Sequence, residues 1–135
     1  SPLDTCFDLS GNNNHGFQIN TFQNPQSQHS ELLNYHKVLK FDGINDLLFF
    51  NEISQIRTVF WVIKESEEVV LNYRPLLGSS TEHPFYRSNV ALWDLTFTNQ
   101  NILSGNTRIN TQTINGLTTP MPNKFSIISH RILCL

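Results

Sequence analysis

The chain has 135 residues, which is long enough for one domain with its own core and too short for two. Its formal net charge is -2 and its Lys and Arg residues are scattered, so no basic field favours nucleic acid as a partner. Its longest apolar runs are strand-sized, well short of the roughly 20 residues that cross a bilayer, so the sequence predicts no membrane insertion.

Strand signals recur along the chain as short runs of Val, Ile, Thr and aromatic residues, which Gly, Pro, Asn and Ser separate. The expected strands are residues 38–41, 47–50, Thr58–Ile63, 69–73, 91–97, 107–110, 113–115 and 125–132. Residues 30–36 are the one modest helix candidate and are equally compatible with a loop, while residues 18–30 and 99–106 are expected to be surface loops. This pattern predicts an all-β protein built as an antiparallel β-sandwich, with very little helix.

Two of the expected strands differ in their polarity. Residues 59–63 are apolar on both faces, which predicts a central strand covered on both sides, with Trp61 in the core. Residues 92–97 mix apolar and polar residues, which predicts a strand half-exposed to water. We therefore expect the second strand, rather than the first, to present a side chain to a ligand.

Five motifs occur in a characteristic order. They are DLSGNNNHG at residues 8–16, LKFDGIND at 39–46, RTVFWVIKE at 57–65, LLGSS at 76–80, and GNTRIN followed by ING at 105–110 and 114–116. The stretch from Asp8 to His130 thereby resembles a bacterial-type laminin-G-like domain, of the concanavalin A-like lectin and glucanase jelly-roll class. The resemblance implies two packed antiparallel sheets in a single domain over residues 1–135. Strands that such domains carry at both ends are not visible, so the chain is expected to be a fragment of a larger protein with exposed sheet edges.

The resemblance also implies a calcium ion that pins the loops. Calcium takes six to eight oxygen ligands, and Asp8, Asn12 and Asn14 supply such oxygens within one loop. The alternative is that these side chains bond their own backbone in turns, which is ordinary chemistry for Asp and Asn.

A carbohydrate site needs an aromatic face for the apolar side of a sugar ring, flanked by groups that bond hydroxyls. Residues of these types stand close together in the sequence as His83, Tyr86, Arg87, Trp93 and Asp94. In this hypothesis Arg87 donates a pair of hydrogen bonds to hydroxyls or a carboxylate, and the ring of Tyr86 or Trp93 stacks against the sugar. The alternative is that Phe85 and Trp93 belong to the core and that Arg87 pairs with a surface acid.

Signals of catalysis are weaker. Glu65 and Glu67 have the even offset of the acids in jelly-roll glycosidases, but the third acid of that motif is displaced, which favours a solvated strand end. Residues 78–80 read Gly-Ser-Ser and lack the glycine that a nucleophile elbow places after its serine. We therefore expect no enzymatic activity.

The combined expectation is a non-catalytic carbohydrate-binding or adhesive module of an extracellular or cell-surface protein, whose partner is a glycan or glycoprotein surface. One alternative is a structural module that assembles through its sheet edges, and another is a glycosidase-related enzyme. Cys6 and Cys134 stand near opposite ends of the chain and are either a disulfide across neighbouring terminal strands or two unpaired thiols.

Overall fold

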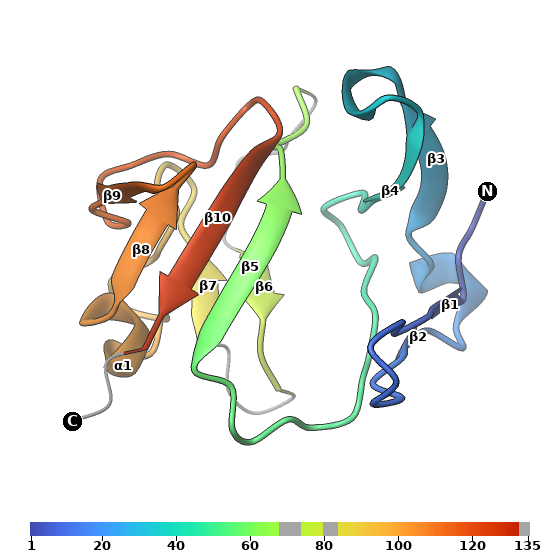
Figure 1. Ribbon diagram of the computed structural model, residues 1–135, viewed down its shortest axis with the longest axis horizontal. Coiled ribbons are helices and arrows are strands. Elements are labelled where there is room, and N and C mark those ends of the chain that lie inside the picture. The colour runs from blue at the N-terminus through green and yellow to red at the C-terminus, as the bar shows by residue number, and fades with distance from the viewer. Residues whose placement is uncertain (68–73, 80–83, 133–135) are drawn as a thin grey trace. The chain divides into compact units, whose positions relative to one another are not determined.

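The structure is a computed structural model that describes residues 1–67, 74–79 and 84–132. It is nearly all β, with 34% strand and 8% helix, and the strand pairs of the described residues are antiparallel. The predicted all-β, antiparallel fold class is therefore confirmed. The chain groups into two compact units, Ser1–Ile53 and Ser54–Leu135 (Figure 1). The single-domain organisation expected from the length stays a prediction.

The first unit contains two two-stranded sheets, β1 with β2 and β3 with β4. In chain order its elements are β1 (Thr5–Cys6), β2 (Gly16–Phe17), the 3₁₀ turn η1 (Thr21–Gln23), β3 (Gln26–Ser30), the 3₁₀ turn η2 (Glu31–Leu33) and β4 (His36–Lys40). Phe17 and Phe49 exchange backbone hydrogen bonds of 2.7 and 2.8 Å, which join the segment after β4 to β2. The fully or nearly buried side chains of this unit are Gln18, Asn24 and Pro25.

In its described residues, the second unit contains a four-stranded sheet in the order β5-β10-β8-β9, a separate β6–β7 pair and one short helix. Its elements are β5 (Thr58–Ile63), β6 (Arg74–Leu77), β7 (Phe85–Arg87), α1 (Gln100–Leu103), β8 (Asn106–Ile109), β9 (Gln112–Ile114) and β10 (Ser126–Arg131). Figure 1 shows β6 and β7 behind β5 and β10. The second unit therefore has two layers of strands.

The core of the second unit lies between these layers. Its buried side chains are Phe85, Leu92, Trp93, Ile102, Met121 and Ile128, and apolar residues of β5 and β6 pack against them. The ring centroids of Trp61 on β5 and Phe85 on β7 are 5.0 Å apart in an edge-to-face arrangement. The packing of the four-stranded sheet against the β6–β7 pair therefore agrees with the predicted two-layered architecture. The jelly-roll connectivity stays a prediction.

The β8–β9 turn shows how a local sequence fixes the register of this sheet. Asn110 and Thr111 both have positive φ, 48° and 74°, which is the conformation of a type I′ turn. The side-chain oxygen of Asn110 accepts the N–H of Ile127 at 2.8 Å, and its amide donates to the hydroxyl of Ser126. The turn is therefore bonded directly to the start of β10.

Several expected strands occur close to their predicted positions. The expected strand Thr58–Ile63 is β5 with the same bounds, and residues 38–41, 107–110, 113–115 and 125–132 correspond to β4, β8, β9 and β10 within two residues at each end. The expected strand at residues 69–73 lies outside the described residues. The β-branched and aromatic runs were therefore reliable signals for β5, β8, β9 and β10.

Other expectations were wrong. Residues 91–97 form bends and a turn instead of a strand, with residues 91–94 buried and residues 95–97 exposed, and residues 47–50 form only a bridge at Phe49. The expected loop 18–30 contains β3, whose polar residues pair with the more apolar β4, and the expected loop 99–106 contains α1, which Asn99 caps. The helix candidate at residues 30–36 contains only the single turn η2. Each error reflects tertiary pairing or burial that overrides local propensity.

One face of β5 is exposed, contrary to the expectation of a strand covered on both sides. Phe60 is 69% exposed and Val62 is 64% exposed, whereas Val59, Trp61 and Ile63 face the core. Exposed and core-facing side chains alternate along β5 because successive side chains of a strand point to opposite faces of the sheet. No helix among the described residues is both long and apolar enough to span a bilayer.

Candidate functional site

The predicted carbohydrate residues occupy two adjoining segments. Tyr86 and Arg87 lie on β7, and Trp93 and Asp94 lie in the buried bend after it. The backbone N–H of Asp94 donates to the carbonyl of Tyr86 at 2.8 Å, which holds the bend against the strand. His83 lies outside the described residues. Four of the five predicted residues are therefore placed, and they are close together.

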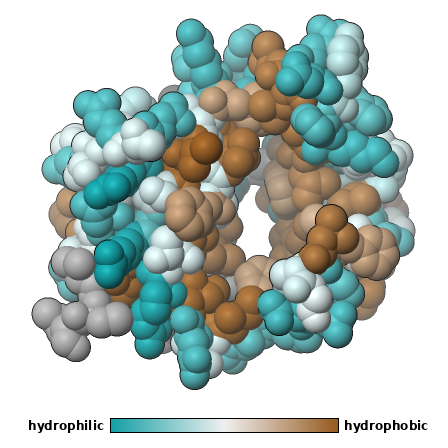
Figure 2. All heavy atoms as spheres, viewed as in Figure 1, coloured by the Kyte–Doolittle hydropathy of each residue, from teal (hydrophilic) through white to brown (hydrophobic). Residues whose placement is uncertain are grey.

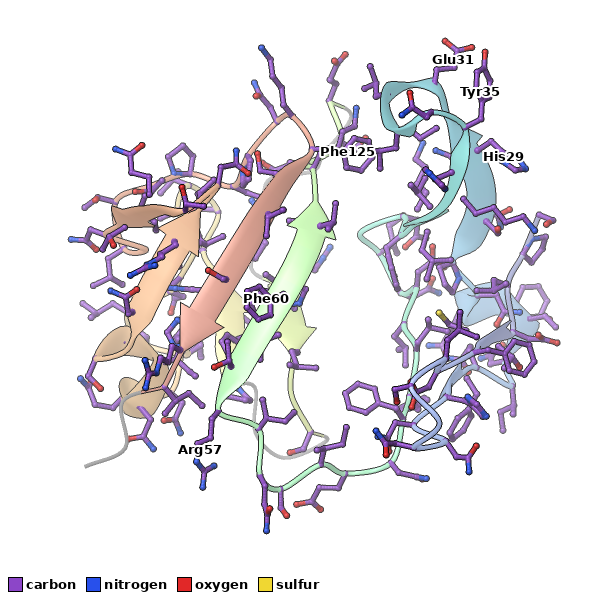
Figure 3. The ribbon with its side chains drawn as sticks, viewed as in Figure 1. His29, Glu31, Tyr35, Arg57, Phe60 and Phe125 are labelled. Atoms are coloured by element: carbon purple, nitrogen blue, oxygen red, sulfur yellow. The ribbon has the colours of Figure 1, made fainter. Side chains whose placement is uncertain are left out.

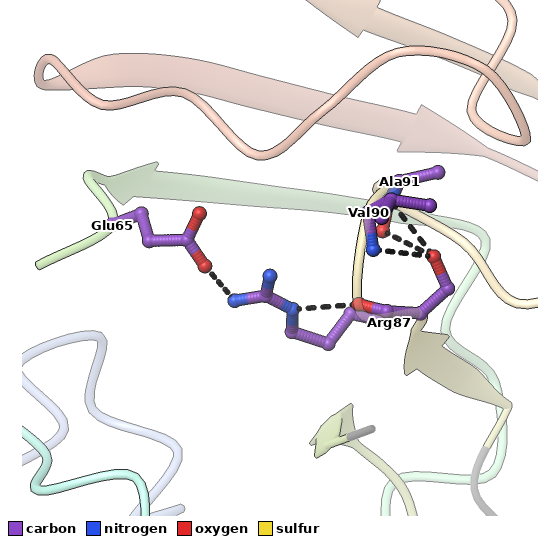
Figure 4. A network of polar contacts seen from close by, with 5 residues as sticks. Glu65, Arg87, Val90 and Ala91 are labelled. Carbon is purple, nitrogen blue, oxygen red and sulfur yellow. Dashed lines mark hydrogen bonds and ion pairs between the residues drawn. The ribbon is translucent and has the colours of Figure 1, made fainter. Parts of the chain in front are cut away.

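Arg87 is buried and its guanidinium is occupied by protein groups. Its Nη1 pairs with the carboxylate of Glu65, and its Nε donates to the carbonyl of Ser88 at 3.2 Å (Figure 4). The hydroxyl of Ser88 in turn accepts the N–H groups of Val90 and Ala91. The ion pair therefore ties the end of β5 to the turn after β7, as in the alternative interpretation of Arg87.

Trp93 is only 2% exposed and lies among the rings of the core. The Trp61 and Phe85 centroids are 6.2 and 5.6 Å from that of Trp93, so the indole has little free surface on which a sugar could stack. Asp94 is 9% exposed, and its Oδ1 accepts the N–H groups of Thr96 and Phe97, each at 2.8 Å. The burial of Trp93 among the core rings agrees with the alternative in which Phe85 and Trp93 belong to the core.

A buried chain of polar side chains begins at Trp93. The indole Nε1 donates to the hydroxyl oxygen of Thr107 at 3.0 Å, and this oxygen lies 2.9 Å from Nδ1 of His130. His130 is fully buried, and burial lowers its pKa to about 4 because the charged imidazolium is disfavoured away from water. Within the described residues, Nε2 of His130 has no hydrogen-bond partner.

Two glycines make room for the rings of Trp93 and His130, which stand at the two ends of this series of hydrogen-bonded side chains. A Cβ added to Gly105 would lie 2.5 Å from Nε2 of His130, and one added to Gly116 would lie 2.1 Å from Cδ1 of Trp93. Such distances are far below van der Waals contact. The absence of a side chain at both positions is therefore required by packing.

A pocket of about 370 Å³ opens beside Trp93 and Thr107. Its lining combines aliphatic side chains, backbone at the two glycines and polar groups: Trp93, Leu103, Gly105, Thr107, Ile114, Asn115, Gly116 and Leu117. Asn115 shapes the rim, since its side-chain oxygen accepts the N–H of Leu117 at 3.0 Å and its carbonyl accepts two further N–H groups. This volume lies within the range of small-ligand pockets, roughly 300–1,000 Å³.

The predicted calcium loop is organised by its own hydrogen bonds. Asp8 accepts the N–H of Ser10 at 2.8 Å and that of Asn14 at 3.0 Å, one on each carboxylate oxygen, and Asn12 donates to the hydroxyl of Ser10. Hydrogen bonds from the hydroxyl and N–H of Ser10, together with the N–H of Asn14, lower the pKa of Asp8. This geometry matches the turn interpretation. In the part of the chain that the structure describes, no group of three His, Cys, Asp or Glu residues is arranged to hold a metal ion.

No protein-family model, curated protein or solved structure matches this chain. The laminin-G-like resemblance, and the calcium ion that it implies, therefore stay proposals.

Sequence reasoning did not anticipate Thr107 and His130 as parts of one polar chain. The signal that was available is the alternation of β10, in which Ser126, Ile128 and His130 share a face. Because Ile128 is the most apolar residue of that face, the pattern directs His130 to the core. Its pairing with Thr107 depends on the β8–β10 register, in which the two residues are direct partners.

Proposed function

We propose that this chain is a non-catalytic carbohydrate-binding or adhesive module of an extracellular or cell-surface protein. The observation that carries the proposal is the pocket beside the buried Trp93, which combines aliphatic side chains and an amide in the second unit. These groups complement a pyranose, whose ring has an apolar face that aliphatic side chains can cover and a rim of hydroxyls that an amide can bond. The proposal therefore assigns sugar binding to the pocket rim instead of to Arg87 and Asp94.

Specific residues have distinct tasks in this site. Leu103, Ile114 and Leu117 supply apolar surface for the face of the sugar ring, and the side-chain amide of Asn115 is a donor for hydroxyls. The buried indole of Trp93 makes the floor rigid because its N–H is fixed by Thr107. A pocket of about 300 Å³ in the first unit has the exposed Phe17 and Ile19 in its lining and no buried apolar cluster behind it.

The test is glycan binding by the full chain, first on an array and then by titration of the best ligand. Leu117→Ala removes apolar surface from the rim and is expected to weaken binding by about 1 kcal/mol, roughly fivefold in dissociation constant. Leu95→Ala is the matched control, since Leu95 is 70% exposed and does not line the pocket. Absence of glycan binding, or equal binding by the two variants, would contradict the proposal.

The two alternative functions have unequal support. The glycosidase hypothesis needs Glu65 as a catalytic acid, and its carboxylate is already paired with Arg87. The assembly hypothesis has a specific observation in its favour, the exposed edge and face of β5. Cys6 is exposed, and Cys134 lies outside the described residues, so the predicted disulfide stays a prediction.

A further inference from the structure

Among the described residues, no strand pairs with the outer side of β5, which is therefore an edge strand. It is the terminal strand of its sheet and, among the described residues, pairs only with β10. The N–H of Ile132 donates to the carbonyl of Arg57 at 3.0 Å, which makes this a hydrogen-bonded pair of the antiparallel ladder. Because such pairs alternate, the N–H and C=O groups of Thr58, Phe60 and Val62 point away from β10.

This edge lacks the features that protect edge strands in monomers. Such strands are usually short or carry Lys, Pro or a bulge, whereas β5 has six residues reading Thr-Val-Phe-Trp-Val-Ile and a regular register with β10. Figure 3 shows Phe60 standing on the open face of β5, and Figure 2 shows hydrophobic residues gathered over β5 and β10 in the same view. Ile127 of β10, 52% exposed, extends this face.

We propose that β5 pairs with β5 of a second copy of this chain, antiparallel, about a two-fold axis at Phe60. In this register Phe60 lies opposite Phe60 of the other copy, and Thr58 lies opposite Val62. In this register each of the three outward-facing residues of one copy lies opposite an outward-facing residue of the other copy. Every outward N–H and C=O group of β5 therefore gains a hydrogen-bond partner. The two Phe60 rings meet beside the axis on the exposed face, a favourable aromatic cross-strand pair.

The charges that flank β5 fit the same arrangement. Arg57 precedes the strand and points away from the sheet (Figure 3), while Lys64, Glu65 and Glu67 follow it, and the Glu65 carboxylate is already paired with Arg87. Antiparallel pairing brings Arg57 of one copy toward the end of the other strand, where Glu67 offers the opposite charge, whereas parallel pairing would set the two Arg57 side chains beside each other. The charged ends therefore favour a second copy in this orientation and disfavour a parallel one.

The first test is the oligomeric state of the full chain by sedimentation velocity across a range of concentrations. We expect a reversible dimer. Phe60→Pro removes an outward N–H without removing a hydrogen bond to β10, and is expected to raise the dimer dissociation constant at least about tenfold. Ile127→Lys is the matched control, because it changes the same exposed face on a strand that is not at the edge.

A monomer at all concentrations would overturn the proposal, as would a dimer that Ile127→Lys dissociates and Phe60→Pro does not. Near-ultraviolet circular dichroism of each variant identifies a loss of fold. If Phe60→Pro unfolds the protein, Phe60→Lys replaces it, since two ammonium groups facing each other at the axis repel.

The second test fixes the register by oxidative cross-linking in a chain whose two native cysteines are replaced by serine. Phe60→Cys is expected to form a disulfide-linked dimer, because the two residues at the axis have Cα atoms about 5.5 Å apart. Val62→Cys is expected to remain unlinked, since its opposite residue is Thr58. Linking of Val62→Cys but not of Phe60→Cys would overturn the proposed register and its axis.

Discussion

The two units of this chain are held together in different ways. All seven buried hydrophobic side chains of the described residues belong to the second unit, whereas the first unit leaves exposed large apolar residues such as Leu9, Ile19 and Phe22. The buried side chains of the first unit are mainly amides, and its loops are closed by Asp, Asn and Ser hydrogen bonds. Strand propensity alone therefore builds hairpins, but a stable core requires that two layers share apolar faces.

The largest expected difference between the units concerns truncation of an aromatic side chain. Trp93→Ala is expected to lower the free energy of unfolding by about 3–5 kcal/mol, because it leaves a cavity among the core rings and removes the donor to Thr107. Phe22→Ala in the first unit is expected to change it by less than about 0.5 kcal/mol, since Phe22 is 87% exposed. Urea denaturation followed by circular dichroism measures both. Similar losses for the two variants would mean that the first unit also has an apolar core.

The next effect is the pH dependence that His130 gives to the second unit. Its pKa is lowered to about 4 in the folded state from an ordinary value near 6.5, so the unfolded chain binds the proton more readily. His130 therefore leaves the free energy of unfolding unchanged well above pH 6.5 and destabilises the fold as the pH falls from 6.5 to 4, by about 2 to 3 kcal/mol over that range.

Urea denaturation at several pH values measures this loss, and His130→Gln supplies the comparison. The variant is expected to lose less stability than the natural chain between pH 6.5 and 4, because glutamine does not titrate. An equally steep fall in both proteins would assign the acid sensitivity to other groups.

A smaller expected effect on stability distinguishes two structural reasons why a position holds glycine: lack of space for a side chain and a positive φ. Gly116→Ala in the second unit is expected to cost about 1–3 kcal/mol through a clash with the Trp93 ring. Gly43→Ala in the first unit meets no atom within 4 Å but has a φ of 73°, so its cost of about 1 kcal/mol comes from backbone strain alone. Replacement by Asn separates the two causes, because Asn tolerates positive φ: Gly43→Asn should be nearly neutral, and Gly116→Asn should remain destabilising.

The strands that the sequence predicted well are those whose propensity and burial agree. β5 and β10 are rich in β-branched residues and also contribute side chains to the core, so a local pattern sufficed. The strand predicted at residues 91–97 was wrong because Leu92 and Trp93 are buried in a bend, and the side chain of Asp94 bonds backbone N–H groups that a strand would pair in a sheet. β3 was missed because its Gln, Ser and His residues show no apolar alternation.

The site was predictable only in part. Sequence proximity correctly indicated that Tyr86, Arg87, Trp93 and Asp94 lie together, but residue type does not reveal which side chains are turned inward. The partners of Arg87 and Trp93 are Glu65 and Thr107, which are 22 and 14 residues away in the chain. Such pairs depend on the packing of β5 and β8 against β7, which a single sequence does not specify.

The unequal edges of the four-stranded sheet limit how large an assembly can grow. At one side stands the six-residue β5, and at the other the three-residue β9, which is too short to be a good template for another strand. A two-fold contact through β5 consumes the long edges of both copies at once, so only the short ones face outward. The result is a closed pair with a continuous eight-stranded sheet, whereas a head-to-tail contact between unlike edges would extend into a filament.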